Sequence, residues 1–199
     1  MKVVIWLLAG LSSLVVLCVA VLLIMGLQPG AGDTRAAVEI SRPPEVVWTW
    51  LTKKDKVMKW VSWLTDVREE TPGVDGIGAR ETWVMSDPNM KKPMEIPSVV
   101  TAYDPPRSVT VHIAAPGMFE GDVTYHLTPV RGGTQLEQLG KWHYSDAFAR
   151  LMVPLITPQA NAKGKMDFTR LKNMIEADTT SAVASAPAGT AAAAAATHP

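Results

Sequence analysis

The sequence predicts an α+β domain in which an antiparallel meander sheet wraps around a long C-terminal helix, with a single transmembrane helix in front. Three observations support this fold class. An amphipathic run occupies Thr157–Ala177, strand-like segments separated by turn signals precede it, and a long apolar stretch opens the chain. The 199 residues, 47% of them hydrophobic, are enough for one domain with appendages.

The apolar stretch at the start is expected to be a membrane anchor. Val3–Leu27 carries no charge, and a helix of its 25 residues is longer than a hydrocarbon core of about 30 Å. A cleaved secretory signal is the alternative, but its apolar region would be shorter, and Ala31-Gly32 is a poor cleavage site. We therefore expect a single-pass protein of the cell membrane. The side of the soluble domain stays open, because Lys2 on one side faces Arg35 and Arg42 on the other.

Composition divides the chain into four parts. A short turn-rich segment after the anchor is typical of a linker, and the Ala-, Ser- and Thr-rich end after Asp178 cannot bury a core. The expected division is a transmembrane anchor at 1–27, a linker at 28–35, a soluble domain at 36–178 and a disordered Ala-rich tail at 179–199.

The soluble domain is expected to begin with one strand and two short helices. Ala36–Ser41 has strand character, and Pro43-Pro44-Glu45 opens a helix with apolar residues at helical spacing. Asp55 is expected to cap the second helix, which ends at Trp63.

Six further strands are expected to follow as a meander. Each is rich in residues that favour strands, and turns rich in Pro, Gly, Asp and Asn separate them. Their expected bounds are Leu64–Glu70, Ile77–Met85, Glu95–Tyr103, Ser108–Ala114, Phe119–Pro129 and Thr134–Tyr144.

The last two strands have a predicted register. A two-residue Gly132-Gly133 loop would make Arg131 and Thr134 its flanking pair. Residues of one parity then form an apolar inward face, and residues of the other parity form a solvated face. The resulting opposed pairs are Leu127 with Gln138, Tyr125 with Gly140, Val123 with Trp142 and Gly121 with Tyr144 inward, and Asp122 with His143 outward.

The final helix is expected to start at Thr157, after a separate short apolar helix over Phe148–Ile156. Thr157 can cap it, and Pro158 suits its first position. Its buried stripe is small in the first half and bulky in the second, and Gly121 and Gly140 thin the facing sheet. We therefore expect an internal cavity, roomiest beneath the first half of the helix. The stripe consists of Ala160, Gly164, Phe168, Leu171 and Ile175.

An ordered set of short segments between Ala36 and Ala177 resembles the SRPBCC or START-like superfamily, within it the polyketide cyclase/dehydrase and lipid-transport group. No segment is specific alone, but their order is. The segments are Val38–Trp48 with Leu51-Thr52, Trp60–Trp63, Gly76–Gly78, Tyr103–Arg107, Leu127–Thr134, and Leu171-Lys172 with Glu176. The resemblance implies a helix-grip fold with a hydrophobic cavity. It also implies a lipid, sterol, polyketide, quinone or hormone as ligand, with a minority of members being enzymes.

Side chains expected to face the cavity are the candidate binding residues. Aromatic rings suit a flat apolar ligand, although core packing is the more common role for any one tryptophan. Gln138 can orient a ligand or bond a buried backbone group or water. Glu81 shares strand parity with Trp83 and is a weak candidate for a general base. The predicted ligand-binding residues are Trp83, Phe119, Tyr125, Gln138, Trp142, Tyr144, Ala160 and Gly164.

The sequence offers little for other chemistry. The formal charge is zero with a pI near 6.9, which indicates no nucleic-acid partner. Cys18 is the single cysteine, and the histidines lack the spacing of a helical zinc pair, so neither a metal nor a cofactor is expected.

Three functions remain open at this point. The first is membrane-anchored binding of a hydrophobic small molecule: a lipid, isoprenoid or polyketide-like compound. The second is an enzyme of the polyketide cyclase or dehydratase type. The third is a non-catalytic scaffold for a membrane partner of unknown identity.

Overall fold

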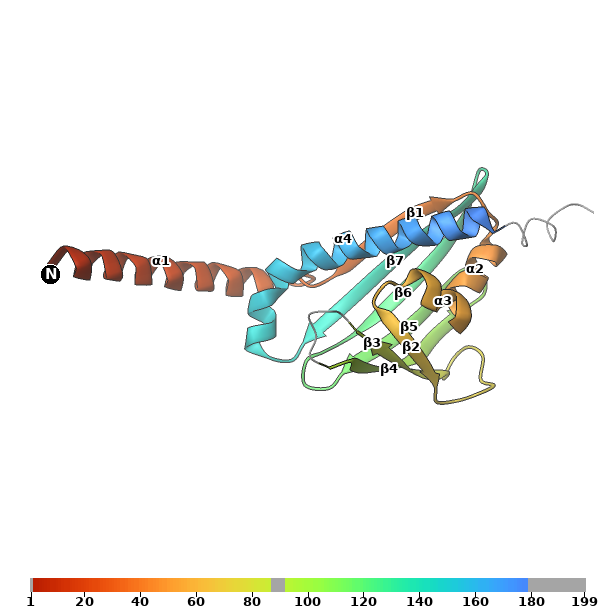
Figure 1. The fold of residues 1–199 in the computed structure, drawn as a ribbon, viewed down its shortest axis with the longest axis horizontal. Helices are drawn as coiled ribbons and strands as arrows, with labels where there is room; N and C mark the ends of the chain where they lie inside the picture. The colour runs from red at the N-terminus through yellow and green to blue at the C-terminus, as the bar shows by residue number, and fades with distance from the viewer. Residues whose placement is uncertain (1, 87–91, 179–199) are drawn as a thin grey trace, which may run out of the picture.

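The computed structural model describes residues 2–86 and 92–178, without the side chains of residues 2–5, 8 and 9. It confirms the predicted α+β architecture, because one antiparallel sheet wraps around a long final helix (Figure 1). The expected tail at 179–199 and the Asp87-Pro88-Asn89 turn lie outside the described residues.

All seven strands join one sheet in the order β1-β7-β6-β5-β4-β3-β2. Strands β2 to β7 follow one another as the predicted meander, and β1 adds to the edge beside β7. β3 starts later than predicted, because Gly76 and Gly78 have φ of 95° and 88° and form a turn. The bounds are β1 Thr34–Ile40, β2 Leu64–Glu69, β3 Arg80–Met85, β4 Met94–Asp104, β5 Ser108–Ala115, β6 Phe119–Val130 and β7 Gly133–Tyr144.

The last hairpin corrects the predicted register by two residues. Val130 pairs with Gly133, so Arg131-Gly132 is the two-residue loop, with Gly132 at φ 92°. Gly133 is already part of β7, and the Ile40 carbonyl occupies the position that a Cβ would take there, so this position requires a glycine. A shift of two keeps every side chain on its predicted face. The observed inward pairs are Gly121 with Trp142, Val123 with Gly140, Tyr125 with Gln138 and Leu127 with Leu136.

The same shift corrects the predicted outward pair of His143 with Asp122. His143 lies opposite Glu120 instead. The Asp122 carboxylate shares a hydrogen bond with Nδ1 of His112 on β5, over 2.9 Å. This is a surface pair on the outward face of the sheet, remote from the final helix.

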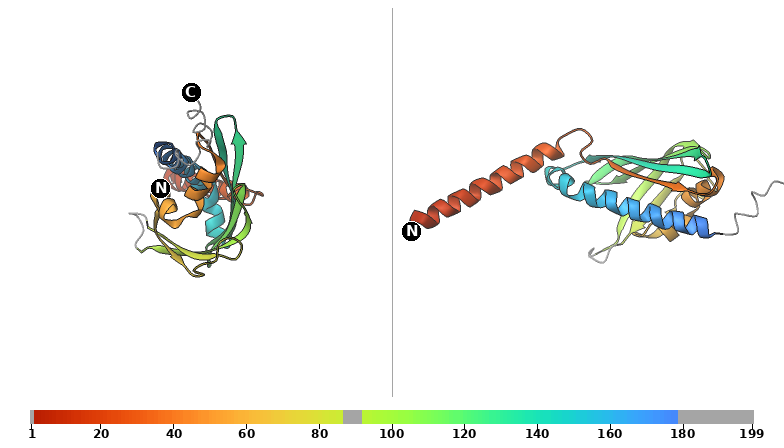
Figure 2. Two further views of the ribbon diagram at one scale, coloured as in Figure 1. Left: turned by 90° about the vertical axis from the view of Figure 1, so that its right-hand side faces the viewer. Right: turned by 90° about the horizontal axis from the view of Figure 1, so that it is seen from above.

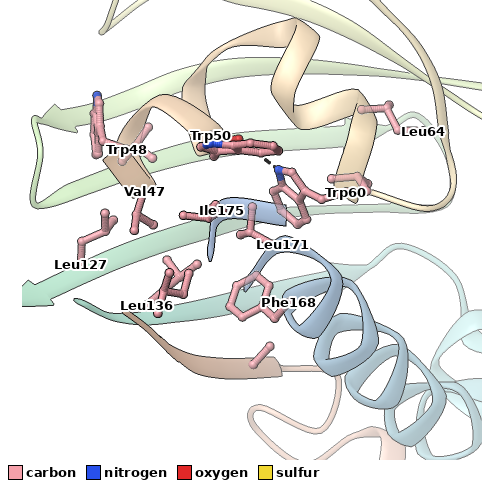
Figure 3. Close-up of a cluster of buried hydrophobic side chains, with 14 of the residues drawn as sticks. Val47, Trp48, Trp50, Trp60, Leu64, Leu127, Leu136, Phe168, Leu171 and Ile175 are labelled. Carbon is pink, nitrogen blue, oxygen red and sulfur yellow. Dashed lines mark hydrogen bonds between the residues drawn. The ribbon is translucent and has the colours of Figure 1, made fainter. Parts of the chain in front are cut away.

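Two short helices fill one end of the sheet. α2 (Pro44–Thr52) begins as predicted, but α3 (Lys54–Trp60) ends before Trp63, because the backbone turns extended at Val61. No side chain caps α3, so the predicted cap by Asp55 is wrong. The indole Nε1 of Trp60 donates to the carbonyl of Trp50 over 3.0 Å (Figure 3).

The hydrophobic core lies between these two helices, the sheet and the second half of the final helix (Figure 3). Phe168, Leu171 and Ile175 of that helix are at most 1% exposed. Their partners include Val47 of α2 and Leu136 of β7, both 0% exposed. This end of the domain is packed solid.

The final helix α4 runs without a break over Ala147–Ala177, which corrects the two predicted helices. Asp146 is its N-cap, since its carboxylate accepts from the backbone N–H of Ala149 at 2.7 Å. Thr157 does not cap a helix; its hydroxyl donates to the carbonyl of Ala31 over 3.3 Å. Pro154 and Pro158 both lie inside α4, where they remove backbone donors, and the first turns point away from the rest of the helix (Figure 1).

The C-terminal end of α4 is tied to the loop between β1 and α2. Glu176 accepts the backbone N–H of Ser41 through Oε1 over 2.8 Å, and its carbonyl accepts from the Arg42 guanidinium, also over 2.8 Å. The Arg42 carbonyl in turn accepts from the Thr134 hydroxyl at 2.7 Å. These bonds satisfy orphan groups at the helix end and fix the first strand against α4.

The first helix, α1 (Lys2–Gly26), projects from the end of the domain opposite to α2 and α3 (Figures 1 and 2). Its last residue packs closely on α4, because the Arg150 carbonyl occupies the position of a Cβ at Gly26. Within the residues whose side chains are described, no helix reaches the length and apolarity that a membrane crossing requires.

Candidate functional site

A cavity of about 660 Å³ lies between the first half of α4 and the sheet. Along α4 its lining runs from Ala149 to Phe168, so it ends where the packed core begins. Its floor is a small apolar cluster formed by Ile96, Ile113 and Val123 of the central strands. The volume is in the range of small-molecule sites in proteins.

Every residue predicted to bind a ligand lines this cavity. They share the inward parity of their strands or the inner stripe of α4, which the two-residue register error left unchanged. These residues are Trp83, Phe119, Tyr125, Gln138, Trp142, Tyr144, Ala160 and Gly164. Their contact with a ligand stays a prediction.

Aromatic rings form much of the wall. The rings of Phe119 and Trp142 lie 5.5 Å apart and nearly perpendicular, at 85°. Trp63 and Trp83 lie 6.1 Å apart with an interplanar angle of 45°. Such offset and edge contacts hold the rings in fixed orientations and present flat apolar surfaces to the interior.

The two inward glycines do not leave the empty hollow that the sequence predicts. The indole of Trp142 occupies the space beside both Gly121 and Gly140. Its Nε1 donates to the Thr34 hydroxyl over 3.0 Å, which holds the ring in this position. The cavity therefore has a tryptophan wall where we expected a gap.

Glu81 does not line the cavity. Its carboxylate accepts a hydrogen bond from Nε1 of Trp83 over 3.0 Å, and its backbone carbonyl accepts from the Ser98 hydroxyl, also over 3.0 Å. Glu81 therefore orients the Trp83 ring from beside the cavity. Because Glu81 does not reach the cavity, its position does not favour a direct role as a general base.

Asp167 is the lining carboxylate, and our sequence interpretation missed it. It lies on α4 three residues after Gly164 and four before Leu171, on the same inner stripe. It is only 7% exposed and lines the cavity. In the described part of the chain its carboxylate has no hydrogen-bonding or ion-pairing partner. A lone charge on an otherwise apolar helical stripe was the available signal.

Tyr125 lies close enough to Asp167 to sense its charge. Burial raises the pKa of the Tyr125 phenol above its ordinary value, and the negative charge of Asp167 acts in the same direction. The phenol therefore stays protonated and remains a hydrogen-bond donor. Gln138 stands directly opposite Tyr125 in the sheet and also lines the cavity. A carboxylate, a phenol and an amide thus share one apolar cavity.

The rim of the cavity is more exposed than its inner end. Met118 and Ile156 are 46% and 39% exposed, and Ala160 is exposed as well, so the first half of α4 borders the opening. Two cations belong to the lining: Arg35 and Lys163, both exposed. The Lys163 ammonium donates to the Ser62 hydroxyl over 2.9 Å.

Among the described residues, no group of three or more His, Cys, Asp or Glu side chains is arranged to hold a metal ion.

The fold and the cavity define a protein of the SRPBCC type. The chain belongs to the family described as polyketide cyclase/dehydrase and lipid transport, which matches residues 32–176. A search among curated proteins found no match.

Solved structures of low sequence identity share the fold. The protein TTHA0849 of Thermus thermophilus is 15% identical with a TM-score of 0.59, and the match covers 77% of this chain and 99% of that one. A Rhodobacter sphaeroides protein is 22% identical with a TM-score of 0.56, covering 74% and 93%. The di-domain ARO/CYC StfQ from the steffimycin biosynthetic pathway is 14% identical with a TM-score of 0.58, covering 73% of this chain and 50% of StfQ. At these identities the likeness shows the fold alone.

Proposed function

We propose that this protein binds a hydrophobic small molecule, a lipid, isoprenoid or polyketide-like compound, inside the cavity beneath α4. The single observation that carries the proposal is the cavity itself, about 660 Å³ in volume, walled by aromatic rings and holding a few convergent polar groups. Membership of a family that includes lipid transport supports it.

We further propose that the protein acts at the cell membrane, anchored by α1. The support is chemical: Val3–Leu27 contains no charged residue, and its described side chains include Trp6 and Leu7, which are 77% and 68% exposed. Such a surface is unfavourable in water. A short linker would then keep the cavity close to membrane-dissolved ligands.

Membrane fractionation of cells expressing the full-length chain tests the anchor. We expect the protein in the membrane fraction, resistant to washing with high salt and alkaline carbonate. Recovery in the washed supernatant would contradict the anchor and leave the binding proposal standing.

Native mass spectrometry of the full-length protein tests the binding. We expect a co-purifying hydrophobic molecule in the wild type, and its loss in Ala160→Phe, which places a ring at the rim of the cavity. Ala162→Phe is the matched control, because Ala162 is exposed on α4 and does not line the cavity. Binding unaffected by Ala160→Phe would contradict a ligand in this cavity.

A second candidate function is polyketide cyclisation or dehydration. One observation favours it: Asp167 can accept a proton, and the Tyr125 phenol can donate a hydrogen bond to a substrate oxygen, within the same cavity. StfQ, whose fold is similar, is described as an ARO/CYC protein. Incubation with a poly-β-ketone would test this by product analysis. Asp167→Asn and Tyr125→Phe should abolish turnover and Glu81→Gln should not; unchanged products in all three variants would exclude the role.

A further inference from the structure

Asp167 stands at a boundary inside the protein. Beyond it along α4, Phe168, Leu171 and Ile175 are sealed in the core; before it, α4 lines the cavity. At 7% exposure the residue has little access to bulk water. It therefore marks the inner end of the cavity, the end farther from the exposed rim.

An unpaired carboxylate in apolar surroundings is unfavourable, and proteins ordinarily supply a partner. The described part of this chain supplies none to Asp167 within hydrogen-bonding or ion-pairing distance. The charged and titratable groups that share its cavity are Tyr125, Tyr144, Arg35 and Lys163. Lys163 bonds Ser62, and both cations are exposed at the rim, where solvent screens them.

Two more polar groups converge on the same space. The Tyr125 phenol keeps its proton and can donate, while the Gln138 amide can both donate and accept. Neither makes a hydrogen bond to another described residue through its side chain. A ligand head that donates to Asp167 and accepts from Tyr125 satisfies both at once. A hydroxyl has both capacities, and a protonated amine has the donor and a complementary charge.

We propose that Asp167 is a specificity-determining residue, which selects apolar ligands with a hydrogen-bond-donating head, a hydroxyl or an ammonium group, and rejects anionic heads such as carboxylates. The apolar body then lies along the aromatic wall toward the rim. This inference rests on the proposed binding function and deepens it.

Equilibrium binding to the full-length protein in lipid nanodiscs tests the inference. The probes are radiolabelled dodecane, dodecanol, dodecylamine and dodecanoate, which share one chain length and differ in the head. Protein-free nanodiscs give the background. We expect dodecanol and dodecylamine to bind at least about tenfold tighter than dodecanoate, the effect of one charge-assisted hydrogen bond.

Asp167→Asn keeps the shape of the side chain and removes its charge. We expect it to bring the affinities for dodecylamine and dodecanoate within about threefold of each other. The matched control Glu120→Gln removes the same charge from the outward face of β6 and should leave the wild-type order unchanged. Asp167→Leu is a second variant should Asp167→Asn fold poorly, and it should lose the same preference.

The outcomes separate the two levels of the proposal. Tight binding of every probe regardless of head, or a preference that survives in Asp167→Asn, overturns the role of Asp167 and leaves hydrophobic binding intact. Failure of all probes, dodecane included, to bind above the nanodisc background counts against the binding function itself. Preferential binding of dodecanoate would show that the rim cations, and not Asp167, select the ligand.

Discussion

The two halves of α4 face the same sheet but differ in how closely they pack against it. The second half is buried to at most 1% exposure at Phe168, Leu171 and Ile175, whereas the first half borders a cavity, with Ala160 exposed at the rim. The difference lies in α2 and α3, which cover only the second half (Figures 1 and 3). A sheet this wide needs more than one helix to fill its inner face, and the unfilled part is the cavity.

The largest expected effect tests the packed half. Leu171→Ala should lower the free energy of unfolding by about 2–5 kcal/mol, because it leaves a cavity at a residue that is 0% exposed. Met166→Ala on the same helix should change stability little, since Met166 is 72% exposed. Urea unfolding of both variants measures the difference. Equal losses of stability in the two variants would contradict the difference between the buried and the exposed face of α4.

The second effect tests the open half and has the opposite sign. Asp167→Leu should raise the free energy of unfolding of the ligand-free protein by about 1–3 kcal/mol, because it removes from apolar surroundings a carboxylate that has no partner among the described residues. Asp146→Ala is the control, since it removes the N-cap of α4 and should destabilise. Thermal unfolding after delipidation gives both signs. Destabilisation by Asp167→Leu would indicate a structural role instead.

A smaller gain is expected at Gly164. A Cβ there would lie 3.5 Å from the Cβ of Ala36, an ordinary contact, so Gly164→Ala should stabilise by about 0.5–1 kcal/mol. Gly140→Ala should destabilise, because the new Cβ would overlap the Thr34 hydroxyl and the Trp142 indole. Chemical denaturation of the two variants measures these changes in stability. It checks whether there is space for a methyl group at Gly164 and none at Gly140.

The smallest expected effect concerns the hydrogen bonds of Glu176 at the C-terminal end of α4. The hydrogen bond from the Ser41 backbone lowers the pKa of Glu176 below its ordinary value, and Lys172 adds to this. A lowered pKa stabilises the fold above the unfolded-state pKa, and this stabilisation is lost as the pH falls through the folded-state pKa. Glu176→Gln should therefore be slightly less stable than wild type at neutral pH. The difference in stability between the variant and the wild type should disappear in acid. Unfolding curves recorded at a series of pH values, from neutral downward, would measure it.

Much of the fold and the cavity lining could be predicted from the sequence, because alternation decides which face a side chain joins. The predicted strand partners of Trp142 and Tyr125 are wrong, but both residues line the cavity as predicted, because a register shift of two residues preserves the face of each side chain. Gly164 and Ala160 followed from helical spacing in the same way.

Other features depended on contacts between distant segments, which no local pattern contains. The Ile40 carbonyl packs so closely on Gly133 that this position requires a glycine. The Asp146 carboxylate caps α4 well before Thr157, whose hydroxyl bonds the carbonyl of Ala31 instead. The Trp142 indole filled the space that two glycines had left.

The sequence by itself determined the meander, the long final helix and the faces of both, because these follow from the periods of strand and helix. Only the tertiary structure decided that α2 and α3 close one end of the cavity and that Asp167 lies at its inner end, without a partner among the described residues. Burial and the absence of a partner are properties of the assembled neighbourhood, and they appear only when segments remote in the chain are brought together.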